Sequence, residues 1–335
     1  MQQMNMPRPT ISTLSQVNVV ASARLHMGFF DLSSLEARTF GSLGLSIDAP
    51  CTELTIIKSA ITKSVITTSE KTFIDAKNCE NISNVVENLV NSLKLTQPFS
   101  LTIKQTIPAH AGLGSGTQLA LAIGAGLNAL FDLNLTVPQI ATAAKRGARS
   151  GIGIAAFEQG GFLVDSGKVS NELPEIALRQ AFPDHWRVLL VNDLAHIGVH
   201  GAVESQAFKS LKPAQHALRN MIFDHMMPAL HRSDLLAFGA YMADLQVYNG
   251  NYFAPIQGGR YASQDVADVL DWLQQNGVAC LGQSSWGPTG FAIVESALQA
   301  EYLQNQAQLA FADKLNISLS ICRGNNTGAS IQSIV

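Results

Sequence analysis

Cysteine is scarce in this sequence. Only four of the 335 residues are cysteines, namely Cys51, Cys79, Cys280 and Cys322, and they lie far apart without a Cys-x-x-Cys pair. This usage excludes a fold held together by many disulfides. We expect the four side chains to be reduced, buried thiols in a cytoplasmic protein.

Charge is scarce as well. Charged residues make up 14% of the chain, the net charge is -3, and no basic stripe is present. The sequence therefore gives no electrostatic basis for binding nucleic acid. Any phosphate group has to be bound by a few local cations and backbone amides. The low charge also argues against a hyperthermophilic source, because such proteins are enriched in Lys and Glu.

Long apolar runs are missing too. The longest one, residues 119–131, is shorter than the roughly 18 residues that a membrane helix needs. The first 16 residues contain no apolar run, so we expect no signal peptide. These absences predict a soluble cytoplasmic protein with no membrane partner. Hydrophobic residues nevertheless make up 47% of the chain, which is ample for a folded core, and the length predicts two domains.

Strand-like and helix-like segments alternate along the chain. Strands are predicted over residues 16–21, 51–58, 64–68, 100–105, 160–167, 186–193, 278–282, 290–294 and 316–322, and helices over 81–95, 115–131, 137–146, 202–210, 213–230, 232–247, 263–276 and 297–310. Thr136 is the predicted N-cap of the third helix. This order indicates a mixed α+β or α/β fold. The looser stretch 171–184 divides it into predicted domains over residues 1–180 and 181–335.

The segment IPAHAGLGSGTQLALAIGAGLNALF, residues 107–131, places three glycines on alternate positions directly before an apolar helix. Glycine lets backbone amides approach an anion, since no Cβ blocks the way. The helix starting near Ser115 adds its N–H groups and the positive end of its dipole. Ser115 and Thr117 add hydroxyls at the cap positions. The pattern predicts a phosphate or pyrophosphate site; the alternative is a helix start that only packs closely against a sheet, which Gly124 and Gly126 favour.

Two familiar phosphate loops are excluded. No Lys-Ser/Thr follows the last glycine of the loop, which excludes a Walker A loop, and Thr117 stands where a G-x-G-x-x-G loop needs its third glycine. The loop instead resembles the second motif of the GHMP kinase superfamily, Pro-x-x-x-Gly-Leu-Gly-Ser-Ser, which Pro108 and residues 112–115 match. Residues 116–118 depart from that motif. They are similar to one branch of the superfamily, β-ribofuranosylaminobenzene 5'-phosphate synthase.

Three further segments resemble the same branch. They are SARLHMGFFDL (residues 22–32), RSGIGIAAFEQGGFLVDSG (149–167) and GQSSWGPTGFAIV (282–294). The resemblance therefore extends over nearly the whole chain. It implies the two-domain GHMP fold, with an N-terminal domain like domain 2 of ribosomal protein S5 and a ferredoxin-like C-terminal domain.

The resemblance also implies a reaction. Enzymes of this branch join phosphoribosyl pyrophosphate to 4-hydroxybenzoate or 4-aminobenzoate in tetrahydromethanopterin biosynthesis. A C–C bond forms, and pyrophosphate and carbon dioxide are released. The resemblance further implies a homodimer that uses Mg2+. In this interpretation the glycine loop faces pyrophosphate rather than ATP, and the residues expected to bind it are His110, Gly112, Leu113, Gly114, Ser115, Gly116, Thr117 and Gln118.

Basic residues are candidates for the anionic groups of the substrates. Arg24 and His26 lie on alternate positions of an extended segment and would share one face. We expect both to be catalytic residues that contact a phosphate or the carboxylate; the alternative is a surface arginine and a structural histidine. In the run KRGARSGIG, the helix dipole alone explains Lys145 and Arg146 at a helix C-terminus. Arg149, beyond the helix, is the better candidate for the site.

Carboxylates and one aromatic residue complete the predicted site. Glu158 is predicted to act as an acid/base and to bind Mg2+ through oxygen. Asp31 is a second predicted metal ligand and Asp165 an alternative one, although either could be a turn residue. In the third motif, SSWGPTG, the side chains of Ser284, Ser285 and Trp286 are predicted to contact substrate. Trp286 would form a wall for the aromatic ring, unless it only packs between the domains.

Two other functions stay open at this point. The first is an ATP-dependent small-molecule kinase, because most of the superfamily are kinases. Residues 116–118, Glu158 and the Trp286 loop favour the transferase over this alternative. The second is a ligand-binding relative without catalysis, which the intact glycines and cations disfavour.

Overall fold

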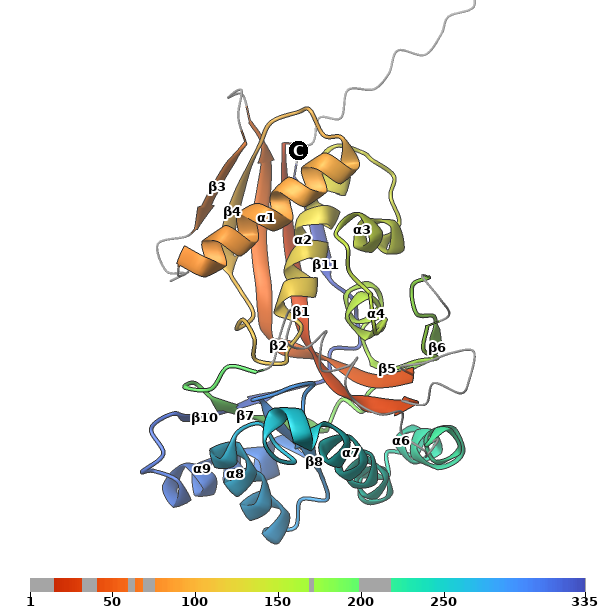
Figure 1. The fold of residues 1–335 in the computed structure, drawn as a ribbon, viewed down its shortest axis with the longest axis vertical. Coiled ribbons are helices and arrows are strands. Elements are labelled where there is room, and N and C mark those ends of the chain that lie inside the picture. Colours follow the sequence, from red (N-terminus) through yellow and green to blue (C-terminus); the bar gives the residue numbers. More distant parts are fainter. Residues whose placement is uncertain are drawn as a thin grey trace, which may run out of the picture.

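The structure is a computed structural model that describes residues 15–31, 41–59, 64–68, 76–168, 172–198 and 218–334. Two sheets form two lobes, drawn one above the other in Figure 1. The helices α1 to α4 lie against the first sheet, and α7 to α9 accompany the second. The predicted mixed α+β fold of two lobes is confirmed.

The first sheet is mostly antiparallel. In the described part of the chain it has seven strands, β1 (Gln16–Asp31), β2 (Gly41–Lys58), β3 (Val65–Thr68), β4 (Phe99–Gln105), β5 (Phe162–Asp165), β6 (Ile176–Gln180) and β11 (Ser330–Ile334). The main order is β11-β1-β2-β4-β3, with β5 pairing β2 and β6 pairing β5. Only β3 and β4 run parallel within this sheet's described pairings. The helix α1 (Ala76–Leu93) connects them, as a parallel pair requires.

Strands β1 and β2 are much longer than predicted. The sequence shows alternation only over their outer halves, because one face is exposed there. Residues 25–30 and 41–47 are buried without interruption. A strand buried on both faces has no period of two, so its sequence carries no strand signal. These buried halves run between the two lobes (Figure 1).

The apolar helix α2 (Ser115–Leu130) packs against β1 and β2. Its interior glycines make this approach possible. A Cβ on Gly124 would come within 2.4 Å of Ile140, and a Cβ on Gly126 within 2.7 Å of Ile56. Close packing therefore explains these two glycines.

Two short helices follow α2. The first, α3 (Val137–Ala143), begins at the predicted cap: Thr136 and Gln139 form a reciprocal capping box. It ends three residues earlier than expected, because Lys145 takes a left-handed conformation with φ 55°. The second, α4 (Ile152–Glu158), was not predicted, since its seven residues are too few to show a helical period.

The second sheet is antiparallel, and in the described residues its order is β10-β7-β9-β8. Its strands are β7 (Arg187–Asp193), β8 (Cys280–Gln283), β9 (Gly290–Val294) and β10 (Ile317–Cys322), and the helices around it are the π-helix η1 (Met221–Met226), α6 (Met227–His231), α7 (Leu235–Gln257), α8 (Gln264–Gln275) and α9 (Ala297–Ala310). The order strand, helices, two strands, helix, strand is the ferredoxin-like pattern. The helix predicted over 202–210 lies outside the described residues, as does the first part of the one over 213–230.

The chain changes sheets between β6 and β7. It then returns at its end, because β11 pairs with β1. The division into residues 1–180 and 181–335 stays a prediction, and it does not anticipate this return. Neither β6 nor β11 was predicted. All five residues of β11 are exposed, so burial imposes no pattern on them.

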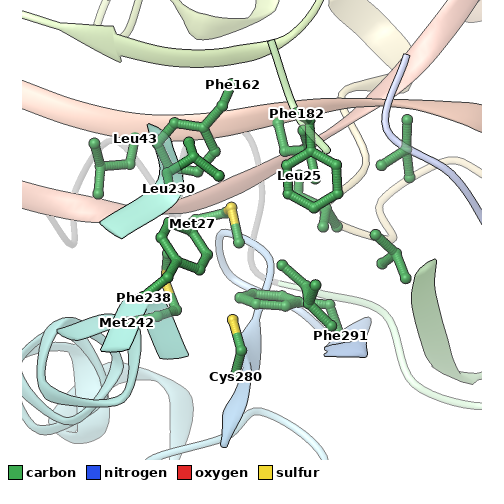
Figure 2. Packing of buried hydrophobic residues seen from close by; sticks show 14 of the residues in the cluster. Leu25, Met27, Leu43, Phe162, Phe182, Leu230, Phe238, Met242, Cys280 and Phe291 are labelled. Atoms are coloured by element: carbon green, nitrogen blue, oxygen red, sulfur yellow. The ribbon is translucent and has the colours of Figure 1, made fainter. Parts of the chain in front are cut away.

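The two lobes share one hydrophobic core, part of which is shown in Figure 2. Buried side chains of the first sheet meet buried side chains from α6, α7, β8, β9 and the segment between β6 and β7. Those labelled in the figure are Leu25, Met27, Leu43, Phe162, Phe182, Leu230, Phe238, Met242, Cys280 and Phe291. The ring of Phe238 lies 5.5 Å from that of Phe162 and 5.8 Å from that of Trp186. This continuity predicts that the lobes unfold together.

The shared core gives a stability prediction. Phe238→Ala should lower the free energy of unfolding by about 3–5 kcal/mol, because it leaves a cavity between the lobes. Unfolding in denaturant should remain one transition. Leu236→Ala on the same helix is the matched control, since that side chain is 74% exposed, and it should change stability by less than about 0.5 kcal/mol. Two separate transitions in the wild-type protein would contradict a shared core.

The cysteines agree only partly with the prediction. All four are thiols rather than disulfides, and Cys280 and Cys322 are buried. Burial raises the pKa values of both of these thiols well above their usual range. Cys79, however, is exposed on α1, so the expectation of four buried thiols is wrong. None of the helices in the described segments is long and apolar enough to span a bilayer.

Candidate active site

A cavity of about 500 Å³ opens between α1, the glycine loop and the loop after β8. Its lining consists of Arg24, Thr52, Asn81, Ile82, Asn84, Val85, Asn88, Thr106, Ile107, Ala109, His110, Gly112, Gly114, Ser115, Gly116, Thr117, Leu119, Arg146, Ser285, Trp286 and Gly287. Most of the predicted loop residues are therefore brought together here. Two are not: Leu113 is buried in the core, and Gln118 is buried and donates from Nε2 to the carbonyl of Gly153 at 2.8 Å.

The glycine loop presents backbone amides to this cavity. Gly112 and Gly114 have φ values of 78° and 82°, in the left-handed region that favours glycine. Gly114 is the N-cap of α2, and no side chain caps the helix. The backbone N–H groups of Thr117 and Gln118 donate hydrogen bonds to the Gly114 carbonyl. No backbone hydrogen bond to another described residue uses the amides of the first two helical residues, 115 and 116. The Ser115 hydroxyl therefore does not cap the helix. The amides of residues 115 and 116 are available to donate hydrogen bonds to an anion.

Arg24 joins β1 to the glycine loop. Its Nη1 donates to the Gly112 carbonyl at 2.6 Å, and its backbone N donates to the Leu113 carbonyl at 3.1 Å. A Cβ on Gly114 would lie only 3.2 Å from the Arg24 side chain. The guanidinium therefore lies against the loop and lines the cavity, and its contact with an anion stays a prediction.

Arg146 is a cation of the site that the sequence interpretation assigned to the helix dipole. A Cβ on Gly116 would lie 3.6 Å from its Nη1, which places the guanidinium beside the start of α2. Burial lowers the pKa of Arg146, although a guanidinium remains charged at neutral pH. The backbone N of Arg146 closes the end of α3 by donating to the Ala141 carbonyl at 2.8 Å. Its guanidinium lines the cavity, a position that the helix dipole does not explain.

The loop after β8 is hydrogen-bonded to both β1 and the glycine loop. The Ser284 hydroxyl accepts from the backbone N of His26 at 3.0 Å and donates to the Gly112 carbonyl at 2.8 Å. The backbone N of Ser285 donates to the His26 carbonyl at 2.9 Å. Ser284 is fully buried, so it positions the loop and does not line the cavity. Ser285 and Trp286 do line the cavity, and their contact with substrate stays a prediction.

His26 faces a different space. Its side chain lines a small recess of about 30 Å³ on the other side of Ser285 and Trp286. Burial, and then the charge of Arg24, lower the pKa of His26 to about 3. The ring is therefore neutral and supplies no positive charge to an anion. This corrects the expectation that Arg24 and His26 act together on a phosphate or carboxylate.

Other predicted residues lie outside the cavity lining. Arg149 lines neither the cavity nor the recess, although its positive charge contributes to the lowered pKa of His26. Glu158 is exposed at the far end of α4 and does not line the cavity, which speaks against catalysis or metal binding by this residue. Asp31 ends β1, and its side chain lies outside what the structure describes.

Asp165 has a structural place. Its buried carboxylate accepts from the hydroxyls of Ser42 and Ser150 at 2.7 and 2.9 Å, and from the backbone N of Gly151 and Gly167 at 2.9 Å each. Burial raises the pKa of Asp165, and these hydrogen bonds oppose that shift. Asp165 therefore fixes the turn before α4.

The described lining of the large cavity contains no carboxylate. No group of three or more His, Cys, Asp and Glu that could hold a metal occurs among the described residues. Magnesium is bound in proteins through carboxylates together with substrate phosphates. The described residues therefore do not form a Mg2+ site by themselves.

Three asparagines of α1, which were not predicted to be site residues, also line the cavity. Asn81, Asn84 and Asn88 lie at spacings of three and four and so share one helix face. Their amides offer donors and acceptors to a substrate. The spacing alone could have indicated a polar face opposite the apolar one.

The two lobes and their sheets form the fold seen in solved structures of small-molecule kinases and a related decarboxylase. Mevalonate diphosphate decarboxylase from Staphylococcus aureus has the same fold, with a TM-score of 0.68 and 15% identity over 96% of this chain and 98% of that one. Homoserine kinase from Cytophaga hutchinsonii has a TM-score of 0.65 and 17% identity over 97% and 100% of the two chains. The sequence matches the GHMP kinases N terminal domain over residues 80–161 and the GHMP kinases C terminal domain over 226–313. The chain belongs to the GHMP kinase superfamily.

Within that superfamily the chain is similar to archaeal enzymes named beta-ribofuranosylphenol 5'-phosphate synthase. It is 27% identical over 291 residues to the one from Methanothermobacter thermautotrophicus, covering 82% of this chain and 87% of that one. It is 29% identical over 328 residues to the one from Archaeoglobus fulgidus, covering 92% and 97%. The resemblance inferred from four short segments is thus confirmed over most of the chain.

Proposed function

We propose that this protein is a decarboxylating pentosyltransferase of tetrahydromethanopterin biosynthesis. It joins phosphoribosyl pyrophosphate to 4-hydroxybenzoate or 4-aminobenzoate, and it releases carbon dioxide and pyrophosphate. Its similarity to the two synthases supports this reaction. The observation that carries the proposal is that segments resembling that branch, from β1, the glycine loop and the loop after β8, meet at one cavity.

The large cavity suits a leaving pyrophosphate. Negative charge builds on this group as its bond to the sugar breaks, and aligned donors stabilise such charge in a dry site. Arg24 and Arg146 supply two cations, and the start of α2 supplies amides at Ser115 and Gly116. His110 and the asparagines of α1 line the remaining wall and would contact the sugar phosphate.

The same cavity is less suited to a kinase. Phosphoryl transfer from ATP uses Mg2+ held by carboxylates and a residue that orients the nucleophile, whereas the described lining has no acid. A kinase remains the second candidate, because the chain is also 26% identical over 216 residues to 4-diphosphocytidyl-2-C-methyl-D-erythritol kinase from a Geobacillus strain, covering 64% of this chain. Magnesium would enter bound to the pyrophosphate of the donor. Mg2+, the homodimer and the cytoplasmic location stay predictions.

Titration calorimetry tests the occupant of the cavity. We expect phosphoribosyl pyrophosphate and inorganic pyrophosphate, each with Mg2+, to compete for one site. ATP should bind at least about tenfold more weakly, since the described lining contains no carboxylate to hold the Mg2+ that a kinase uses with ATP. Binding of ATP that is tighter than that of phosphoribosyl pyrophosphate would overturn the proposal and favour the kinase.

A further inference from the structure

The outer face of α9 (Ala297–Ala310) is apolar although it lies on the surface. Figure 1 shows this helix at the outside of the second lobe, next to α8. One side of α9 packs against β7 and β10. On the opposite side, the side chains of Leu298, Tyr302 and Leu309 are 79%, 63% and 73% exposed. The helix therefore has two apolar faces, a pattern typical of helices that are covered on both sides.

The neighbouring helix α8 shows what an ordinary surface helix of this lobe exposes. Its exposed residues are all polar, namely Gln264, Asp271, Gln274 and Gln275. In contrast, α9 contains a single charged residue, Glu301. Isolated apolar side chains are normal on a protein surface, whereas a contiguous apolar patch marks a contact with another molecule. The outer face of α9 is such a patch.

The spacing of the outer residues indicates what covers them. Leu298, Tyr302, Asn305 and Leu309 follow one another at intervals of four, three and four residues, and Asn305 is exposed like the others. This is the repeat with which two helices pack along a common seam, and a single asparagine within a seam fixes the register of the pair. The face therefore fits a partner helix that carries the same repeat.

The seam is also symmetric about its centre. The midpoint between Leu298 and Leu309 in the sequence is also the midpoint between Tyr302 and Asn305. In an antiparallel pair of two such helices about a two-fold axis, residues equally far from the midpoint face each other. Each leucine then faces a leucine, and each tyrosine faces an asparagine. The α9 helix of a second copy of this chain is therefore a complementary partner at all four positions.

We propose that α9 forms the interface of a homodimer, in which it packs antiparallel against α9 of a second copy. The charges agree with this pairing, since the same symmetry places Glu301 opposite Gln306 of the partner subunit and brings no like charges together. No residue of α9 lines the large cavity, so the inference does not depend on the proposed reaction.

The size of the seam predicts the strength of the dimer. A helix of 14 residues is about 21 Å long. It covers only part of the roughly 800 Å² that each partner buries in a standard interface. We therefore expect a dimer that dissociates on dilution rather than a permanent one.

Analytical ultracentrifugation over about a hundredfold range of concentration tests the surface. The wild-type chain of 35.8 kDa should be dimeric at the upper end of the range. Leu298→Glu and Leu309→Lys should each raise the Kd of the dimer by about a hundredfold or more, because the two-fold axis repeats the substitution and buries two unpaired charges. Leu236→Glu is the matched control, since this leucine of α7 is equally exposed, and it should leave the Kd unchanged.

A mixture of two variants tests the antiparallel register. When Leu298→Glu chains meet Leu309→Lys chains, the new glutamate faces the new lysine at one point of the seam, and leucine faces leucine at the other. This mixture should form a heterodimer, which native mass spectrometry detects when one variant carries an affinity tag. Mixing Leu298→Glu with Leu309→Glu is the control, because it brings two glutamates together, and it should form no heterodimer.

Three results would overturn the proposal. The first is a wild-type protein that is monomeric at every concentration. The second is a dimer whose Kd neither substitution in α9 changes, which would place the interface elsewhere. The third is equal heterodimer formation in the two mixtures, which would exclude the antiparallel register. The substituted side chains are all exposed in the single chain, so the variants should fold like the wild type.

Discussion

The Arg146→Ala variant is expected to lose about a hundredfold or more in kcat/KM for phosphoribosyl pyrophosphate, the size found when a donor to developing charge is removed. Arg146 lines the cavity beside the start of α2 and is largely withdrawn from water. In the proposed reaction its charge would therefore act on the leaving group with little screening. Arg146→Lys should recover only part of the activity, because the ammonium keeps the charge but loses the planar fork.

Steady-state kinetics and thermal unfolding together check this result. Arg323→Ala is the matched control, since this arginine is exposed and pairs with Asp48 at 3.1 Å on the surface. It should leave kcat/KM unchanged. Wild-type activity in a folded Arg146→Ala protein would show that Arg146 only interacts with the helix dipole and has no role in the cavity.

Two alanine substitutions in the glycine loop should have different consequences. Gly112→Ala should destabilise the protein and abolish activity, because a Cβ there would lie 2.3 Å from the Ser284 carbonyl and φ is 78°. The left-handed conformation alone costs an alanine about 1–2 kcal/mol. Gly116→Ala should fold normally, since φ is not left-handed there and the nearest atoms belong to Arg146, 3.6 Å away. Its methyl group would nevertheless stand between the helix start and the anion.

Melting temperatures and pyrophosphate affinities separate the two effects. For Gly116→Ala we expect a melting temperature near that of the wild type and pyrophosphate binding that is weaker by about tenfold or more. For Gly112→Ala we expect a fall of several degrees. Normal pyrophosphate binding by Gly116→Ala would contradict the place assigned to the anion.

The glycine loop was predictable because its information is local. Glycines at left-handed positions, the following helix and the four family-like segments are all visible in the sequence. Thr136 and the strand β7 were found for the same reason. The buried halves of β1 and β2 were not, since burial on both faces removes the alternation that marks a strand.

The parts of the site that depend on distant contacts could not be predicted. Arg146 reaches the cavity only because α3 ends early. His26 and Arg24 are two residues apart, yet Ser284 and Ser285 bond the backbone at His26, and the loop that carries them separates the two spaces. Glu158 looked suitable by its position in a motif, but the unpredicted helix α4 carries it away from the cavity. Such relations depend on packing between the lobes, which no single segment encodes.

Release of carboxyl label tests the central claim most directly. The protein is incubated with phosphoribosyl pyrophosphate, Mg2+ and 4-hydroxybenzoate labelled in its carboxyl group. We predict labelled carbon dioxide and pyrophosphate in equal amounts, and loss of both in Arg146→Ala. Retention of the label, with consumption of ATP when a sugar or alcohol is supplied, would contradict the transferase and identify a kinase.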